Sequence, residues 1–300
     1  SECRRAVSSL MVRLMFFFER AAANRDLHTA YRRQRQMGIR DRLGVDPSDI
    51  HITTGDTSSI PYSGTAGGSR VTRSMASAIH DASSDIVEQV KERIATKLGV
   101  EPEFVEFADG QFSARDVPDN SMSFRDAANE AISSGNDIVA SASNNPNMRA
   151  ANGYALTIAD VDVDPDTGKV DVLRYTALQD VGKAIHPSYV EGQLQGGVAQ
   201  GIGWALNEEY VYNASGEMDN SSFLDYRMPT SLDLPMIDTV IVEVANPGHP
   251  FGARGVGEVC IVPPLAAMAN AIHDAAGVRM EVLPMSPGNV LEAMWAKDGK

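Results

Sequence analysis

The stretch Gly252-Ala-Arg-Gly-Val-Gly-Glu258 is the most informative segment of this chain. Its three glycines within six positions permit left-handed backbone angles and let another molecule approach the main chain closely. The run ends in one carboxylate, Glu258, and Pro263-Pro264 follows at an expected helix start. A lone acid on a rigid glycine turn beside a helix start is a candidate catalytic base.

A second glycine turn, Gly67-Gly68-Ser69-Arg70, precedes the longest helical pattern in the sequence. Apolar residues recur every three or four positions from Val71 to Leu98, and Gly99 follows where a helix-terminating glycine belongs. Backbone N–H groups, a hydroxyl and the positive end of the helix dipole would suit a bound phosphate at this helix start. The alternative interpretation is an ordinary N-cap by Ser69.

A third glycine-rich run, Val190 to Trp204, carries glycines 192, 196, 197 and 201 at helical spacing. Each glycine costs about 1 kcal/mol relative to alanine inside a helix, so the row needs a compensating role. Close backbone packing is the simpler explanation, and room for a cofactor is the other. Gln193 is one of three glutamines interleaved with these glycines.

The remaining patterns predict a mixture of strands and helices without regular alternation, which is typical of an α+β fold. Turn residues 164–168 separate two of the strands. The expected strands are 51–54, 156–163, 170–178 and 239–244, and further helices are expected at 263–276, before Gly277, and at 287–295, after Ser286.

Composition limits the function classes. Hydrophobic residues make up 43 % and charged residues 22 % of the chain, as in globular proteins, and no uncharged apolar run reaches 18 residues, so no membrane span is expected. A net charge of −14 disfavours nucleic acid as a partner. The only cysteines, Cys3 and Cys260, cannot hold an iron–sulfur cluster by themselves, and free thiols favour a cytoplasmic location.

The first 42 residues differ from the rest of the chain. They contain ten Arg, no Lys and four acidic residues, a net charge of +6, which leaves −20 on the other 258 residues. One interpretation is a surface helix with a basic face. The other is that part of residues 1–38 is non-native sequence, such as an out-of-frame translation.

Several familiar catalytic patterns are absent from the sequence. It contains no G-x-x-x-x-G-K-[ST] phosphate loop, no H-E-x-x-H zinc motif and no G-x-S-x-G nucleophile elbow. The six histidines are scattered without metal-ligand spacing, and residues 252–258 do not complete a nicotinamide-binding fingerprint. If the chain is an enzyme, we expect a bound cofactor to carry the difficult chemistry.

Five segments taken in order resemble the molybdenum-binding subunit of the xanthine dehydrogenase / aldehyde oxidase / carbon monoxide dehydrogenase family. The resemblance covers about residues 43–298, which match the C-terminal half of such subunits. The segments are Gly64-Thr-Ala-Gly-Gly-Ser-Arg70, Asp180-Val-Gly-Lys-Ala-Ile-His-Pro187, Val190-Glu-Gly-Gln-Leu-Gln-Gly-Gly-Val-Ala-Gln-Gly-Ile-Gly203, Gly252-Ala-Arg-Gly-Val-Gly-Glu258 and Leu283-Pro-Met-Ser-Pro287.

This resemblance implies a molybdopterin cofactor, in the cytosine dinucleotide form of many bacterial members. It implies hydroxylation of an electron-poor carbon of an aldehyde or N-heterocycle, with water as the oxygen source and Glu258 as general base. Residues 43–300 would form the molybdopterin-binding domain, with subdomains 43–150 and 151–300, after the atypical segment 1–42. The implied cofactor contacts are Gly67, Gly68, Ser69, Arg70, Gln193 and Gly257, and no protein side chain is expected to ligate the metal.

The resemblance also implies partners, because iron–sulfur and flavin (FAD) centres would lie on other subunits and the N-terminal half of the molybdenum subunit on another chain. Two departures stand out. The family's Gly-Gln-Gly motif is not found before Leu43, and Val259-Cys260 replaces the usual Pro-Pro after the glutamate. The alternative is therefore a truncated relic without cofactor that acts only as a binding or structural subunit. The substrate stays open.

Overall fold

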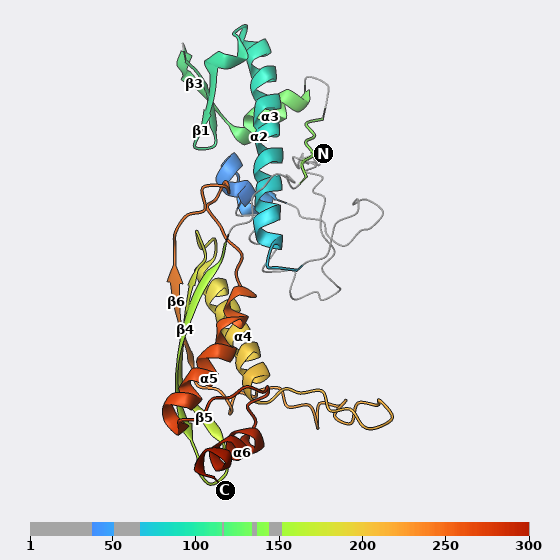
Figure 1. Cartoon of the computed structure of the whole chain (residues 1–300). Helices are drawn as coiled ribbons and strands as arrows, with labels where there is room; N and C mark the ends of the chain where they lie inside the picture. The colour runs from blue at the N-terminus through green and yellow to red at the C-terminus, as the bar shows by residue number, and fades with distance from the viewer. Residues whose placement is uncertain (1–37, 51–66, 116, 134–136, 144–151, 300) are drawn as a thin grey trace, which may run out of the picture. The chain divides into compact units, whose positions relative to one another are not determined.

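The computed structural model describes residues 38–50, 67–115, 117–133, 137–143 and 152–299. The predicted strand at 51–54 and the atypical segment up to residue 37 lie outside these ranges. The chain separates into two compact units, Ser1–Arg149 and Ala150–Lys300. Each unit is described by itself below, and Figure 1 labels their elements.

The first unit is organised by the long helix α2, Val71–Leu98. The apolar positions of the sequence pattern form its buried stripe, in which Ile86 and Val90 are fully buried. Gly99 ends the helix at φ 67°, and its N–H donates to the carbonyls of Ala95 and Thr96. The predicted extent of this helix and its glycine terminator are therefore confirmed.

A small antiparallel sheet of order β1-β2-β3 and the helix α3 pack in the same core. Phe112 of β2 and Phe124 of α3 are buried, with ring centroids 6.2 Å apart. Both Asp109 and Gly110 have positive φ, which suits the two-residue turn between β1 and β2. The expectations from sequence omitted this hairpin. The elements are η1 Pro47–Asp49, η2 Pro102–Phe104, β1 Val105–Ala108, β2 Gln111–Ala114, β3 Val117–Ser123 and α3 Phe124–Ser133.

The second unit is built on a sheet of order β4-β5-β6. Strands β4, Tyr154–Val163, and β5, Val170–Asp180, form the predicted hairpin and pair antiparallel. Strand β6, Ile237–Val242, pairs parallel with β5 and begins two residues before the expected position. Burial alternates along all three strands, because one face is covered by helices.

Helices α4, Pro187–Leu206, and α5, Pro263–Ala276, cover that face (Figure 1). Their buried residues pack with the β5 side chains in one apolar cluster. Gly277 ends α5 at φ 69°, as predicted, and α6, Pro287–Asp298, follows Ser286 and runs three residues beyond the expected end. Mixed sheets with packed helices confirm the α+β class.

One stretch, Val259–Ala276, is long and apolar enough to cross a membrane by length and composition. In the structure it consists of the 3-10 turn η3, Val259–Ile261, and the 14-residue helix α5. A continuous helix of 14 residues is shorter than the roughly 20 residues that a bilayer requires. Met268 and Ile272 of α5 are fully buried in the core of the unit. The length and composition of this stretch are therefore weak evidence for a membrane span.

Candidate functional site

The loop that carries Glu258 is fastened to the end of strand β5. After β6, residues 252–254 of the loop run alongside residues 181–183. Gly182 and Ala253 form an isolated antiparallel bridge between the two segments. The N–H of Arg254 donates to the Val181 carbonyl, and the N–H of Lys183 donates to Gly252, each over 2.9 Å. A Cβ on Gly182 would lie 2.2 Å from the Gly252 carbonyl oxygen. Glycine at 182 therefore permits this close pairing of the two segments.

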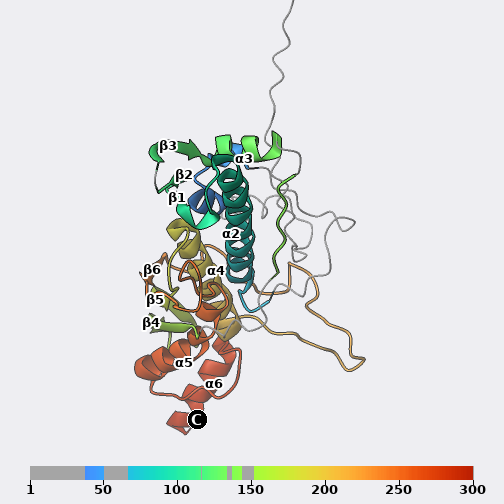
Figure 2. The ribbon, with the colours of Figure 1, turned by 90° about the horizontal axis from the view of Figure 1, so that it is seen from above.

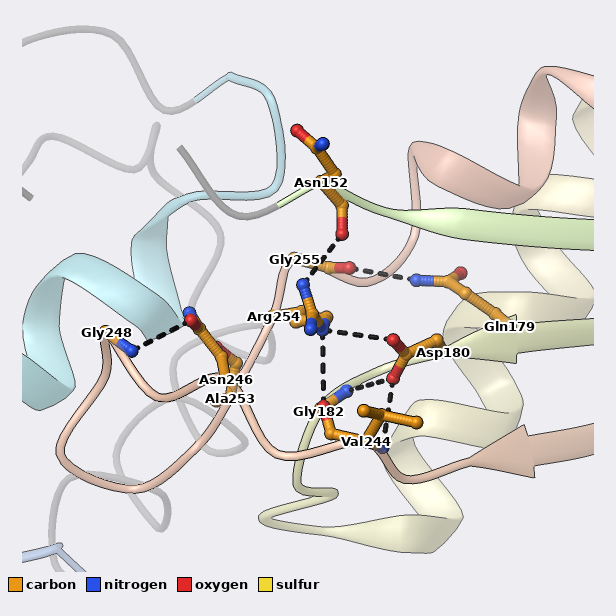
Figure 3. Close-up of polar contacts among 10 residues, drawn as sticks. All are labelled: Asn152, Gln179, Asp180, Gly182, Val244, Asn246, Gly248, Ala253, Arg254 and Gly255. Atoms are coloured by element: carbon orange, nitrogen blue, oxygen red, sulfur yellow. Dashed lines mark hydrogen bonds and ion pairs between the residues drawn. The ribbon is translucent and has the colours of Figure 1, made fainter. Parts of the chain in front are cut away.

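A largely buried ion pair reinforces the attachment (Figure 3). Arg254 Nε lies 3.1 Å from Asp180 Oδ2, and the two side chains are only 13 % and 11 % exposed. The other Asp180 oxygen accepts from the N–H groups of Gly182, at 2.9 Å, and Val244, at 3.2 Å. Arg254 Nη1 donates to the Asn152 carbonyl over 2.9 Å. Asp180 thus ties together the ends of β5 and β6 and the glycine loop.

Gln179 makes the next connection from β5 to the loop. Its amide nitrogen donates to the Gly255 carbonyl over 2.9 Å (Figure 3). Its amide oxygen accepts from the Cys260 thiol over 3.1 Å. Gln179 and Cys260 are both buried, so each side-chain hydrogen bond is made away from water. The segment that contains Glu258 is therefore held on both sides by one glutamine.

The approach to the loop is a turn held by two buried polar residues, Asn246 and His249. Asn246 donates to the Ala253 carbonyl and accepts from the Gly248 N–H. Nδ1 of His249 accepts from the N–H groups of Phe251, at 3.2 Å, and Ala253, at 3.1 Å. Because Nδ1 accepts these bonds, it carries no proton, and this histidine has a structural role in the loop.

Helix α4 packs directly against the Glu258 segment through its glycines. A Cβ on Gly197 would lie 2.5 Å from the carbonyl oxygen of Gly257. A Cβ on Gly201 would lie 2.7 Å from the Pro264 side chain. Close packing therefore explains these two members of the glycine row. Gln193 lies one helical turn before Gly197 on the same helix.

The two other glycines of the row have no such explanation. A Cβ on Gly192 or Gly196 would meet nothing within 4 Å in the part of the chain that the structure describes. Gln193, between them, is exposed, and so is Glu258. Gly257 has φ 108°, a conformation that favours glycine directly before the acid. Gly257, directly before Glu258, thus packs on α4 at Gly197, one helical turn after Gln193.

The other predicted contacts lie at the start of α2, in the first unit. Gly67, Gly68 and Arg70 are exposed, and Ser69 is half-buried. Neither glycine would bring a Cβ within 4 Å of any atom among the described residues. Ser69 has φ 52° and precedes the N-cap, which is Arg70, so the ordinary N-cap by Ser69 is not observed. The predicted residues therefore form two sets, one in each unit.

These residues fit a pterin cofactor that brings its own metal ligands. No described residue fills the volume that a side chain would take at Gly67, Gly68, Gly192 or Gly196. No three His, Cys, Asp or Glu gather as a metal site within the described ranges. Sequence reasoning assigned no role to Gln179, Asn246 or His249. The turn sequence Asn246-Pro-Gly-His249 could have indicated a structural role for Asn246 and His249.

Adjacent glycines of α4 should respond oppositely to alanine. Gly197→Ala places a methyl group against the Gly257 backbone and should lower the free energy of unfolding by about 1–3 kcal/mol. Gly196→Ala meets open space and should raise it by about 0.5–1 kcal/mol, through reduced backbone entropy of the unfolded chain. Urea unfolding followed by tryptophan fluorescence measures both. Equal effects of the two substitutions would contradict the packing described here.

Burial of the Cys260 thiol should make stability fall at alkaline pH. Desolvation raises the pKa of Cys260 from 9.0 to about 11, so the unfolded thiol loses its proton first. The contribution of the buried, protonated thiol to the free energy of unfolding is fully present below pH 9. It falls by about 2 kcal/mol as the pH rises to about 11. Cys260→Ser keeps a hydroxyl donor for Gln179 but does not titrate in this range. Superimposable unfolding profiles of the two proteins between pH 8 and 11 would refute this.

Comparisons with known proteins identify the family of this chain. A family profile described as molybdopterin cofactor-binding domain matches residues 36–235. The chain is 32 % identical over 265 residues to 6-hydroxypseudooxynicotine dehydrogenase complex subunit gamma of Paenarthrobacter nicotinovorans, covering 84 % of this chain and 33 % of the relative.

Solved structures give the same result. The crystal structure of quinoline 2-oxidoreductase from Pseudomonas putida 86 matches with a TM-score of 0.74 and 30 % identity, over 87 % of this chain and 34 % of that one. The Cu,Mo-CO dehydrogenase structure matches with a TM-score of 0.78 and 26 % identity, over 89 % of this chain and 34 % of that one. The chain spans about one third of the length of these relatives.

The profile match covers most of the chain, and the fold match extends through both units. The resemblance drawn from the five sequence segments is thereby confirmed at the level of the family. The chain belongs to the molybdopterin cofactor-binding domain family, whose members include molybdenum-binding subunits of xanthine dehydrogenase and the large chain of carbon monoxide dehydrogenase.

Proposed function

We propose that this chain is the molybdopterin-binding part of an oxidoreductase that hydroxylates an electron-poor carbon of an aldehyde or N-heterocycle. The observation that carries the proposal is the close approach of Gly197 of α4 to Gly257, the residue before Glu258, which supports a position for this acid close to the helix. In a family of molybdopterin-binding domains, an exposed carboxylate fixed next to a vacant helix surface suits a catalytic base.

Each set of residues suits a different chemical part of such a cofactor. Backbone N–H groups near Gly67 and Gly68, with Ser69 and Arg70, would bind the phosphates of a cytosine dinucleotide at the start of α2. Gln193 and the backbone of Gly257 would contact the pterin end. When bound, the cofactor supplies the two-electron redox chemistry that no side chain of the protein provides.

The protein's own contribution is positioning and proton transfer. Conversion of R–H and water to R–OH releases two protons and two electrons. A carboxylate oxygen of Glu258 accepts one proton as the water-derived oxygen joins the substrate carbon. Asp180, Arg254 and Gln179 keep the loop in place, so the carboxylate loses little freedom when it acts. The electrons would leave through iron–sulfur and flavin centres on partner subunits.

We propose a cytoplasmic, heteromeric assembly in which this chain works with the rest of a molybdenum subunit and with iron–sulfur and flavin subunits. The relatives differ in the substrates that their names print, among them quinoline, carbon monoxide and 6-hydroxypseudooxynicotine. The test is oxidation of aldehydes and N-heterocycles by the purified complex in 18O-labelled water. One labelled oxygen is expected in the hydroxylated N-heterocycle, whereas an unlabelled hydroxyl group, with its oxygen from O2, would overturn the proposed reaction.

The second candidate is a relic without cofactor that serves as a binding or structural subunit. The absent Gly-Gln-Gly motif before Leu43 favours it, because part of the cofactor contact would be missing. In such a relic the Glu258 loop would keep its shape but perform no proton transfer. The two candidates differ in the molybdenum content of the native complex.

A further inference from the structure

A long arm, residues 207–236, joins α4 to β6 and projects from the side of the second unit (Figures 1 and 2). Its root is anchored in the unit. The Tyr226 hydroxyl donates to Glu208 over 2.7 Å, and Leu234 packs on the apolar core. A Cβ on Gly203 of α4 would lie 2.6 Å from the Pro229 side chain. The arm therefore begins and ends at fixed points.

The outer part of the arm is folded by its own polar groups. Asn213 Oδ1 accepts from the N–H groups of Ser215 and Glu217, each over 3.0 Å. Tyr212 and Met218 form an antiparallel bridge across this turn. The arm thus has a defined backbone, so its shape is set before any partner binds.

The returning part of the arm is fixed in the same way. Ser222 Oγ donates to Asp225 over 2.8 Å, and the N–H of Tyr226 donates to the Ser222 carbonyl. Thr230 donates to Asp233 through both its N–H, at 2.7 Å, and its hydroxyl, at 2.8 Å. Polar side chains therefore fold this segment internally, while its apolar side chains take no part in these bonds.

The large apolar side chains of the arm point to solvent. Phe223 is 88 % exposed, Leu224 94 %, Leu232 95 % and Met236 84 %. Burial of such side chains against a partner would remove a large apolar area from water and favour association. Four of them on one preformed segment make an interaction surface, because monomeric proteins rarely leave such a group in water.

The charge of the arm identifies the kind of partner. It carries six acidic residues and one basic residue, Arg227, a net charge of −5. Residues 43–300 carry −20, so this part of a second copy would meet the arm with like charge. Opposite potentials favour association and like charges disfavour it. The surface therefore suits an apolar site with a basic border.

We propose that residues 207–236 dock onto a partner subunit of the assembled enzyme, in an apolar groove edged by Lys and Arg. Phe223, Leu224, Leu232 and Met236 enter the groove, and the acidic side chains of the arm meet its border. The inference rests on the proposed function only in assuming that an assembly forms. It assigns the arm to recognition between subunits rather than to the cofactor site.

Photo-cross-linking in the assembled complex tests the proposal. A benzophenone amino acid at position 223 should cross-link to a different polypeptide, at an apolar segment with neighbouring Lys or Arg. The same probe at Leu173, an equally apolar position that is 62 % exposed on β5, is the control and should give far less of this product. Cross-links only within the chain or to a second copy, or none in an intact complex, would overturn the proposal.

Matched substitutions give a second readout. Leu224→Ser combined with Leu232→Ser should weaken retention of the partner at least about tenfold, while Leu173→Ser should leave it unchanged. Raising the salt concentration should weaken retention of the partner by the wild-type chain, because the contacts at the border of the groove are ionic. Unchanged retention of the double variant would also overturn the docking role. A cross-linked complex without molybdenum would instead refute the proposed function and leave the arm's role standing.

Discussion

Glu258→Gln should lower turnover of the assembled enzyme by about 100- to 10,000-fold and leave its molybdenum content unchanged. Glutamine has nearly the same size and can form similar hydrogen bonds, but it cannot accept the proton that the reaction releases. The loop is held by Asp180, Arg254 and Gln179, none of which depends on the acid at 258. The loss should therefore fall on the chemical step.

Steady-state kinetics and metal analysis of the same preparation measure both quantities. Glu292→Gln, the same chemical change at an exposed position of α6, is the control and should retain full activity. Glu258→Asp keeps a carboxylate on a shorter side chain and should retain part of the rate. Turnover of Glu258→Gln within a few-fold of wild type would remove Glu258 from the role of base.

Asp180→Asn should lower the free energy of unfolding of the second unit by about 3 kcal/mol. The change leaves the Arg254 guanidinium largely buried without its opposite charge, and an amide is a weaker acceptor for the Gly182 and Val244 N–H groups. Both tryptophans of the chain, Trp204 and Trp295, lie in this unit, so their fluorescence reports its unfolding in urea.

The matched control is Asp238→Asn on β6. Asp238 forms an ion pair with Arg174 at 3.4 Å in which both side chains are more than half exposed, so its loss should cost less than about 0.5 kcal/mol. Adding Arg254→Gln to Asp180→Asn should recover part of the stability, because it removes the unpaired charge. Equal effects of Asp180→Asn and Asp238→Asn would contradict the structural role given to the buried pair.

Local patterns predicted much of this fold. The apolar period of Val71 to Leu98 and the turn at 164–168 each follow from neighbouring residues, so α2 and the β4–β5 hairpin were predicted. The start of β6 was misplaced by two residues, because its pairing with β5 is set by distant contacts. The β1–β2 hairpin was overlooked although Asp109-Gly110 signalled it.

The site was also predictable only in part, because its residues lie in recognisable local segments but its contacts join distant ones. Glu258 and Gln193 stand in recognisable glycine-rich segments, but the packing of these two segments depends on the contact of Gly197 with Gly257, which lies 60 positions away. Close packing and room for a cofactor were the two explanations for the glycines of α4, and only some of these glycines are closely packed. Gly197 and Gly201 are required for packing, while a side chain at Gly192 or Gly196 would meet none of the described residues. Long-range hydrogen bonds such as Gln179 to Gly255 leave no local signal.

The central claim is that the residues around Glu258 serve a bound molybdopterin. The most direct measurement is the molybdenum and pterin content of the complex purified from the organism that produces this chain. The proposed function predicts stoichiometric molybdenum and a pterin dinucleotide for each copy of the chain. A folded chain in an intact complex that contains neither would contradict that function and favour the relic.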